Sequence, residues 1–245
     1  MSRLHAWHAL DRTPVRRVAA AIRPCAERKC TVLASPGCAQ IHAVSHALQK
    51  SRALRHYARI APAYDRRVTR GPLVHLRRRE RAAVLRLARL APGLSLADVG
   101  CGTGYYALEA KRRGLRVCAI DAVPEMLVQL HGKVDEVRLG DVEALAESAP
   151  FDRVICAGVL DFVSDPELAF ARLCAVVAPG GRLVVLVPRT GPGGWLYRVE
   201  KFCFGLRVNL FDSRWFVSRA GRHGLRVSEV CTPLPGNLVI AADRA

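Results

Sequence analysis

Two features of the chain have the residue types and the spacing to hold a nucleotide. The first is a loop with three alternating glycines, Gly100, Gly102 and Gly104, which directly follows a short apolar segment. Glycines at such a place allow positive φ and let the backbone come close to a ligand. The second is Asp121, an acid at the end of the next apolar segment. A carboxylate there can accept hydrogen bonds from ribose hydroxyls. Together the two features predict a nucleotide-type cofactor.

The spacing alone leaves the choice of cofactor open. Read from Gly102, the loop also satisfies the dinucleotide fingerprint, with an acid about 20 residues further on. A nicotinamide-dependent oxidoreductase is therefore one alternative at this point.

A longer stretch of sequence favours another cofactor. The segment from Ala97 to Ala107 resembles the first motif of class I S-adenosylmethionine-dependent methyltransferases, in which an acid precedes the three glycines. Four further segments resemble later motifs of that family in the same order, and they are Cys118–Asp121, Leu139–Glu143, Phe151–Ala157 and Ala178–Arg182. The likeness extends from about Tyr57 to Ala245, and it implies S-adenosyl-L-methionine as the cofactor.

The resemblance also implies a role for each matching position. The acid and glycines of the first motif would shape the pocket for the methionine part of the cofactor. Asp121 would hold the ribose, Asp141 and the Val142 amide would contact the adenine, and Tyr64 would help to close the pocket. The expected cofactor-binding residues are Tyr64, Asp98, Gly100, Gly102, Gly104, Asp121, Asp141, Val142 and Ala157.

Candidate residues for the acceptor side follow the fourth and fifth predicted strands. Methyl transfer from a sulfonium needs mainly proximity and in-line alignment, so a general base is optional. Asp161 is the candidate catalytic residue, because relatives place substrate-facing residues near this position. Arg189 is a candidate partner for an anionic substrate group. Trp195 begins an apolar helical face that predicts a lid over an apolar substrate or a membrane-touching helix, with ordinary packing as the alternative.

The resemblance is strongest to the group that includes quinone, tetrapyrrole and phospholipid methyltransferases. We therefore expect methyl transfer to a small, hydrophobic or lipid-like acceptor, with oxygen, nitrogen and carbon targets all open. One alternative is an RNA methyltransferase that uses the basic N-terminal region as a clamp. We expect no metal, because the spacings of Cys25, Cys30 and Cys38 match no common zinc pattern.

These residues require a sheet that brings the carboxyl ends of several strands together. Short apolar runs alternate with helical patterns after residue 92, which predicts a parallel sheet with helices on both faces. The expected fold class is α/β, with a doubly wound, mostly parallel sheet of seven strands in the order 3-2-1-4-5-7-6 and an N-terminal helical extension. The expected strands are Leu94–Val99, Leu115–Ile120, Glu136–Leu139, Arg153–Ala157, Arg182–Val187, Leu225–Val230 and Leu238–Ala242.

Charge and composition divide the chain into three expected parts. Residues 1–90 contain 20 Lys and Arg against four acids, whereas residues 91–245 contain 18 against 17. We predict a disordered or mis-annotated basic extension at 1–50, a helical cap at 51–92 and the methyltransferase domain at 93–245. The nine cysteines form no Cys-x-x-Cys pair, which fits a reducing compartment. We therefore predict a cytoplasmic protein, with peripheral contact to an anionic membrane through its basic region.

Overall fold

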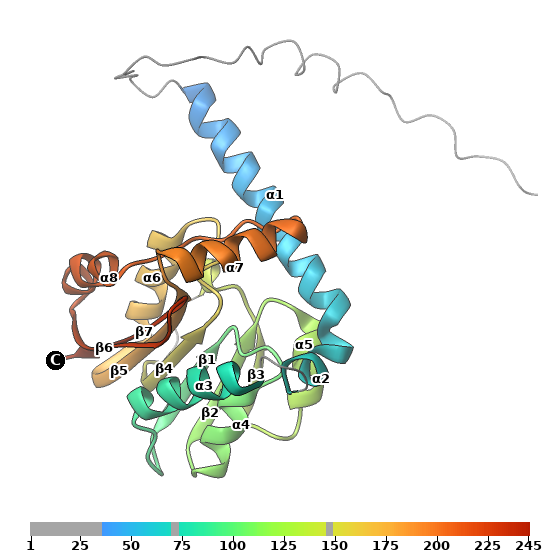
Figure 1. Ribbon diagram of the computed structural model, residues 1–245. Coiled ribbons are helices and arrows are strands. Elements are labelled where there is room, and N and C mark those ends of the chain that lie inside the picture. Colours follow the sequence, from blue (N-terminus) through green and yellow to red (C-terminus); the bar gives the residue numbers. More distant parts are fainter. Residues whose placement is uncertain (1–35, 70–73, 146–148) are drawn as a thin grey trace, which may run out of the picture. The chain divides into compact units, whose positions relative to one another are not determined.

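The structure, a computed structural model, describes residues 36–69, 74–145 and 149–245. Its centre is a seven-stranded sheet in the order β3-β2-β1-β4-β5-β7-β6 (Figure 1). The pairs among β1 to β5 are parallel, and β7 runs antiparallel to both of its neighbours. The strands are β1 (Ser95–Val99), β2 (Arg116–Asp121), β3 (Glu136–Leu139), β4 (Phe151–Ala157), β5 (Val177–Pro188), β6 (Leu225–Leu234) and β7 (Asn237–Arg244). The predicted fold class and strand order are confirmed.

Helices connect the strands and precede the sheet in the chain. The α-helices are α1 (Pro36–Ile60), α2 (Tyr64–Thr69), α3 (Val74–Ala88), α4 (Tyr105–Arg112), α5 (Pro124–Leu127), α6 (Pro166–Ala175), α7 (Pro192–Cys203) and α8 (Ser213–Ala220). Short 3₁₀ turns are η2 (Ala61–Ala63), η3 (Val128–Leu130), η4 (Val142–Ala144) and η5 (Gly221–His223). Aspartates are the N-caps of α6 and α8. The Asp165 side chain accepts a hydrogen bond from the Leu168 amide, and the Asp212 side chain accepts one from the Trp215 amide.

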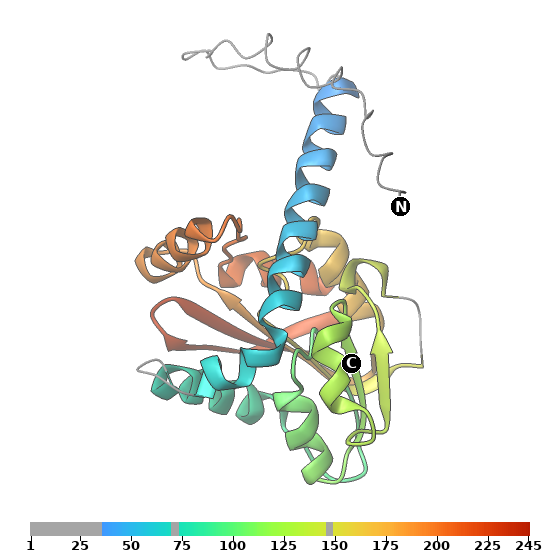
Figure 2. The same ribbon diagram turned by 90° about the vertical axis from the view of Figure 1, so that its right-hand side faces the viewer.

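The sheet has one hydrophobic core on each face. Successive residues of a strand point to opposite faces, so Val154 and Cys156 of β4 pack with α6 and α8. Ile155, between them, packs with α3 and α4 on the other side. Both faces are therefore covered by helices, as the continuous apolar runs of the central strands require (Figure 2).

Two smaller hydrophobic clusters lie where α1, η2 and the segment after α7 meet the domain. Ala53 of α1 packs with Phe162, Leu206 and Val208. Ala61 packs with Val123 and Met126, which follow β2. The second half of α1 is thereby held beside the loops that follow β2 and β4.

The structure departs from the sequence prediction at a few boundaries. β4 begins two residues early, at Phe151, because Phe151 pairs with Val177 before a register irregularity in the ladder. β5 begins five residues early, at Val177, and β6 continues four residues further than expected, to Leu234. Residues 1–35 of the predicted 1–50 extension lie outside the described residues, and residues 36–50 form the first part of helix α1. Within the described ranges, no helix is both long enough and apolar enough to span a bilayer.

Candidate cofactor and acceptor site

The glycine loop leaves β1 with its backbone tied to the neighbouring strand. The amides of Gly100 and Cys101 both donate to the carbonyl oxygen of Ile120, at 2.8 and 3.0 Å. Gly102 has a φ of +54°, and no atom lies within 4 Å of the place where its Cβ would stand. The middle of the loop is therefore open backbone that a ligand can approach.

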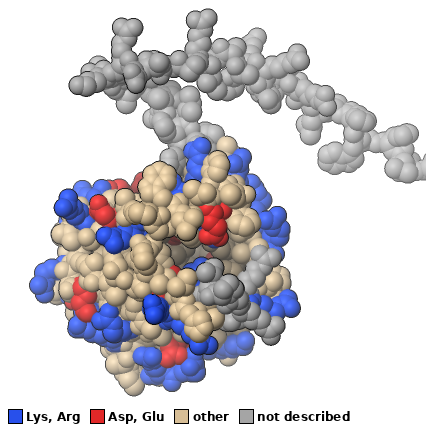
Figure 3. Space-filling view, in the orientation of Figure 1, with Lys and Arg blue, Asp and Glu red and all other residues tan. Residues whose placement is uncertain are grey.

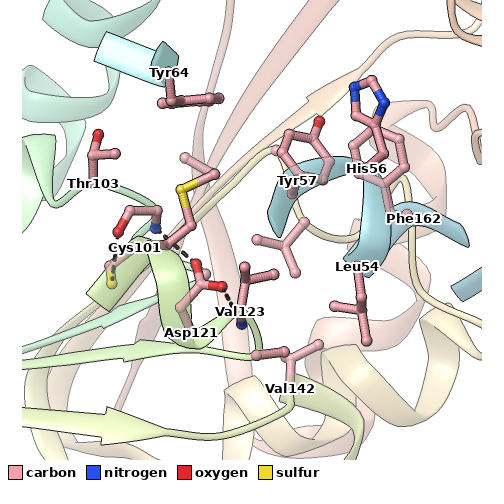
Figure 4. A pocket seen from close by; sticks show the side chains of 18 of the residues that line it. Leu54, His56, Tyr57, Tyr64, Cys101, Thr103, Asp121, Val123, Val142 and Phe162 are labelled. Carbon is pink, nitrogen blue, oxygen red and sulfur yellow. Dashed lines mark hydrogen bonds between the residues drawn. The ribbon is translucent and has the colours of Figure 1, made fainter. Parts of the chain in front are cut away.

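Asp121, at the end of β2, holds this loop from the side. One carboxylate oxygen accepts the Gly102 amide at 2.7 Å, and the other accepts the Val123 amide at 2.9 Å (Figure 4). Burial raises the pKa of Asp121 above its usual range, while these backbone hydrogen bonds oppose that rise. Each oxygen keeps acceptor capacity for a further donor, as a ribose-binding carboxylate needs.

Asp98 and Gly104 join the loop to helix α4. Asp98 is buried in β1, and its carboxylate accepts the Ala107 amide of α4 at 2.9 Å. Gly104 is the N-cap of α4 with φ +87°, and a Cβ there would lie 2.2 Å from Leu130. Neither residue lines the cavity described below, so their expected roles reduce to shaping the loop.

The adenine end predicted from the resemblance lies at η4. Val142 is buried, and one oxygen of Asp141 accepts the Glu143 amide at 3.0 Å. Lys50 of α1 forms ion pairs with both Asp141 and Glu143. These two carboxylates raise the pKa of Lys50 against the opposing effect of burial. α1 thus meets the carboxylate that the resemblance assigns to the adenine.

Three aromatic rings stand over the opposite end of the site. The centroids of Tyr57 and Tyr64 are 6.3 Å apart, and those of Tyr57 and Phe162 are 5.4 Å apart, both in edge-to-face arrangement. Thr103 of the glycine loop donates to Asp65, the residue after Tyr64, at 2.5 Å. Tyr64 and Thr103 both line the cavity described below, and the role of Tyr64 in closing it stays a prediction.

The glycine loop, the end of β2, η4 and the aromatic rings border one cavity of about 430 Å³. Its wall includes Gly100, Gly102, Asp121, Asp141, Val142, Ala157 and Tyr64 from the predicted set. The volume is within the range of about 300–1,000 Å³ that is typical of ligand sites. The open backbone at Gly102 and the acceptors at Asp121 and Asp141 fit a nucleoside with an amino group and ribose hydroxyls. The residues present therefore fit S-adenosylmethionine.

The wall formed by α3 carries opposite charges. Arg77 donates to the buried Glu80 at 3.1 Å, and Asn237 of β7 donates to the same carboxylate. Arg81 stacks on the Tyr105 ring, with its guanidinium carbon 3.7 Å from the ring centroid. Burial raises the pKa of Glu80, and the Arg77 charge opposes that effect. These groups make one side of the cavity polar and mostly paired.

The candidate acceptor residues lie in three different places. Asp161 is buried behind the cavity wall, where it accepts the Tyr197 hydroxyl at 2.9 Å. Arg189 is exposed after β5, and its amide donates to the Gly236 carbonyl oxygen at 2.7 Å. Trp195 lines a separate surface pocket together with Arg198 of the same helix and Trp215 of α8. Neither Arg189 nor Trp195 reaches the main cavity.

Trp195 does not reach the cavity because another face of α7 borders it. Tyr197, Glu200, Lys201 and Phe204 recur at helical spacing and line the cavity. Leu196, Val199 and Phe202 lie on the other side of the helix and are exposed. α7 does border the cavity, as the lid prediction expects, but through its polar and aromatic face.

Sequence reasoning missed several residues of the wall. Lys50, Leu54 and Tyr57 lie on one face of α1, and Tyr197 lies on α7. The spacing of four and three residues along α1 is a helical signal that could have singled out that face. Nothing in the sequence indicated that this face would meet the glycine loop.

Comparison with known sequences agrees with this geometry. The methyltransferase-domain family matches residues 97–185. The demethylmenaquinone methyltransferase of Thermus thermophilus is 40% identical over 158 residues, which are 58% of this chain and 70% of that protein. The ubiquinone biosynthesis O-methyltransferase of Xanthomonas campestris is 38% identical over 122 residues, or 46% of this chain and 51% of that protein. The chain thus spans about half the length of relatives such as the Xanthomonas enzyme.

Solved structures share the fold. Magnesium protoporphyrin IX methyltransferase from Synechocystis, with bound S-adenosylhomocysteine, superposes with a TM-score of 0.65 at 17% identity. The match covers 80% of this chain and 100% of that one. The sheet order, the glycine loop with its acid at β2 and these matches lead to one assignment. The chain belongs to the class I S-adenosylmethionine-dependent methyltransferases.

Proposed function

We propose that the protein transfers a methyl group from S-adenosylmethionine to a small, apolar, hydroxyl-bearing acceptor of the quinol type. The observation that carries this proposal is a single cavity whose wall contains both the glycine loop and an aromatic cluster. Gly102 and Asp121 stand at one part of the wall, and Tyr57, Tyr64 and Phe162 stand at another. A cofactor on the loop and a flat apolar ring among the aromatics would share this space.

The chain's own contribution is positioning and exclusion of water. When bound, the sulfonium cofactor supplies the activated methyl group. Asp121 and Asp141 would fix the nucleoside, and Tyr57 with Phe162 would hold the acceptor ring by edge and face contacts. Such alignment is the main requirement of the reaction.

The acceptor class is supported by the relatives. The Xanthomonas and Thermus proteins are named for ubiquinone and demethylmenaquinone substrates, respectively, which are both quinone-related. The aromatic lining fits a ring of that kind, and the polar α3 wall fits its oxygen substituents. We favour oxygen as the methylated atom, because Tyr197 and the α3 groups offer hydrogen-bonding partners to a hydroxyl.

The test is a methyl-transfer assay with radiolabelled S-adenosylmethionine. The acceptors are a short-chain dihydroxybenzene that mimics a quinol precursor, a demethylmenaquinol analogue, and a mixture of transfer RNA. We expect label in the first acceptor, with a product heavier by one methyl group. Label in the RNA alone, or in none of the acceptors despite cofactor binding, would contradict the proposal. Label in the menaquinol analogue alone would keep the acceptor class and correct the atom to carbon.

We further propose that α7 brings this acceptor from an anionic membrane surface. Leu196 and Phe202 expose 73% and 68% of their surfaces, and Trp195 and Val199 expose 56% each. Arg198 is exposed on the same helix. Figure 3 shows uncharged surface in the middle of one face of the molecule, with most Lys and Arg side chains along its edge. Apolar side chains flanked by basic ones suit a bilayer interface.

A further inference from the structure

We propose that Tyr197 and Asp161 together accept the proton of the acceptor hydroxyl, with Tyr197 touching the acceptor and Asp161 standing behind it. This inference rests on the proposed function and assigns roles to residues of the same site. Tyr197 would be a catalytic residue, and Asp161 would act through it.

The position of Tyr197 provides the first observation. It lines the cavity from α7, beside Lys201 and Phe204, and packs in the same cluster as Tyr57 and Phe162. Its hydroxyl donates to the Oδ2 atom of Asp161 at 2.9 Å. A phenol that donates to a carboxylate has its oxygen lone pairs free to accept a proton. An acceptor ring held by Tyr57 and Phe162 would bring its hydroxyl to this oxygen.

The environment of Asp161 provides the second observation. The residue is only 1% exposed, and its Oδ1 atom is one of three buried side-chain polar atoms in the described part of the chain that have no hydrogen-bond partner. A buried carboxylate oxygen without a partner is costly, and such cases call for an explanation other than stability. Its backbone is fixed, since the Asn209 amide donates to the Asp161 carbonyl oxygen at 2.9 Å.

The groups that face Asp161 come from several elements. Tyr197 and Lys201 lie on α7, Arg77 on α3, Tyr57 on α1 and Cys156 on β4. Burial raises the pKa of Asp161 to about 6, against the opposing effects of the Tyr197 hydrogen bond, the Asp161 backbone amide and the two cations. The carboxylate is thus largely ionised at neutral pH, yet basic enough to take up a proton. Burial and the Asp161 charge raise the pKa of Tyr197, so the phenol stays neutral before and after the step.

The proposed step moves one methyl group and two protons. A bond forms between the acceptor oxygen and the methyl carbon, and the carbon–sulfur bond breaks with its electron pair left on sulfur. The acceptor hydroxyl proton passes to the Tyr197 oxygen, while the Tyr197 proton passes to Asp161 Oδ2. The chain then holds one extra proton on Asp161, which returns to solvent.

The kinetic test compares two acceptors in the variants Tyr197→Phe and Asp161→Asn. One acceptor is a phenol that is neutral at assay pH, and the other is a nitro-substituted analogue that is already ionised. With the neutral phenol we expect kcat to fall about 10²-fold in each variant, the size of a typical general-base contribution. With the ionised analogue we expect kcat close to that of the unaltered protein, because no proton has to leave. Asp165→Asn, at the exposed N-cap of α6, is the matched control and should keep both activities.

A second readout does not depend on turnover. Carbon NMR of labelled aspartate should show one carboxyl that titrates at about pH 6, absent in Asp161→Asn. In Tyr197→Phe its pKa should rise further, because a hydrogen bond to the charged form is lost. Equal losses of kcat with both acceptors, full activity of either variant with the neutral phenol, or a pKa unmoved in Tyr197→Phe would overturn the inference. An unaltered protein that binds cofactor but methylates neither phenol would instead show that the proposed function itself is wrong.

Discussion

Gly100 is the residue at which the glycine loop is most tightly enclosed. Its φ is +72°, and a Cβ at this position would lie 2.0 Å from Cγ2 of Val159, a side chain that also lines the cavity. Valine has little freedom to turn away, because it is branched at Cβ. Gly93 has a similar φ of +84° but nothing within 4 Å of its Cβ position, so it isolates the backbone effect from the clash.

We therefore expect Gly93→Ala to lower the free energy of unfolding by roughly 1–2 kcal/mol, the usual cost of a left-handed conformation. Gly100→Ala should cost about 1–3 kcal/mol more, as overpacking does. It should also weaken cofactor binding, because Val159 must move into the cavity. Urea unfolding of both variants measures the difference, and equal costs would contradict the packing described for Gly100.

Asp98 makes stability depend on pH. Burial raises its pKa to about 7 in the folded chain, against about 3.9 when unfolded. Between these values the folded state binds more protons than the unfolded state, so the free energy of unfolding falls as pH rises. Asp161, with its pKa raised to about 6, acts in the same direction.

Replacing Asp98 by Asn keeps an oxygen for the Ala107 amide but removes the titrating group. We expect the fall between about pH 5 and pH 7 to become shallower, by up to about 1.4 kcal/mol per pH unit for one proton. Asp135→Asn is the control, because the Lys111 ammonium lowers the pKa of this exposed carboxylate and moves its effect below about pH 4. Urea unfolding at several pH values across this range measures the effect. If the free energy of unfolding of Asp98→Asn changed with pH as steeply as that of the unaltered protein, Asp98 would not be the titrating group.

For single residues, the sequence indicated which acids and glycines belong to the loop region, but not which of them line the cavity. Asp121 and Gly102 are recognisable because motif spacing determines where a strand ends. Asp98 and Gly104 share the motif, but whether a side chain faces the cavity or the core depends on packing. Tyr197 was not predicted, because its partner Asp161 is 36 residues away in the sequence, in the loop that follows β4.

Among the elements, β5 is tied to three neighbours by one buried arginine. Arg182 donates to both oxygens of Asp243 on β7 at 2.6 and 2.9 Å. It also donates to Glu229 on β6 at 2.9 Å and to the Leu87 carbonyl oxygen on α3 at 2.8 Å. The Arg182 side chain is 5% exposed, whereas the Glu229 and Asp243 side chains are 32% and 34% exposed, so water reaches these pairs from the carboxylate side.

We expect Arg182→Met to lower the free energy of unfolding by about 1.5–3 kcal/mol, the contribution of a hydrogen bond to a charged group. Arg138→Met, which breaks a more exposed pair with Glu136 within β3, should cost about 0–1 kcal/mol. Urea unfolding compares the two. A similar small loss for both would mean that Arg182 does not hold the β5, β6 and β7 strands together.

The exposed apolar side of α7 should contribute to binding of lipid vesicles. Replacing Leu196 and Phe202 together by Gln removes two large apolar side chains, each worth about 1.5–3 kcal/mol when buried. We expect binding to vesicles of mixed neutral and anionic lipid to fall at least about tenfold, with unfolding unchanged. Val217→Gln, at a residue of α8 that is 58% exposed, is the matched control. Vesicle sedimentation measures the effect, and equal binding by the two proteins would contradict the proposed membrane contact.

At the element scale, the strands were predictable because buried parallel strands read as continuous apolar runs. Which face of α7 borders the cavity could not be predicted in the same way. Its apolar side points to solvent and its mixed side borders the cavity, which reverses the usual inference from an amphipathic pattern. Only the three-dimensional path of the chain after β5 determines that choice.

At the scale of the whole molecule, strand order followed from resemblance, and the structure gives it a physical basis. Each central strand alternates its side chains between two cores, which fixes the register. The parallel pairing of β1 to β5 leaves their carboxyl ends together at one edge. The position of the second half of α1 at that edge could not be predicted, because helix periodicity says which face is buried but not against what. The site therefore depends on contacts between parts that are far apart in the chain.

We expect S-adenosylmethionine to bind at this edge of the sheet, with its ribose hydroxyls hydrogen-bonded to Asp121. Calorimetric titration with S-adenosylmethionine, S-adenosylhomocysteine and NAD(H) tests it directly. We expect both sulfur nucleotides to bind in the micromolar range, and Asp121→Ala to weaken them at least about 10²-fold, since hydrogen bonds to a charged group contribute about 1.5–3 kcal/mol each. Asp135→Ala should bind as the unaltered protein does. Binding of NAD(H) in place of the sulfur nucleotides would contradict the assignment of the cofactor. An unchanged affinity in folded Asp121→Ala would contradict the role of Asp121.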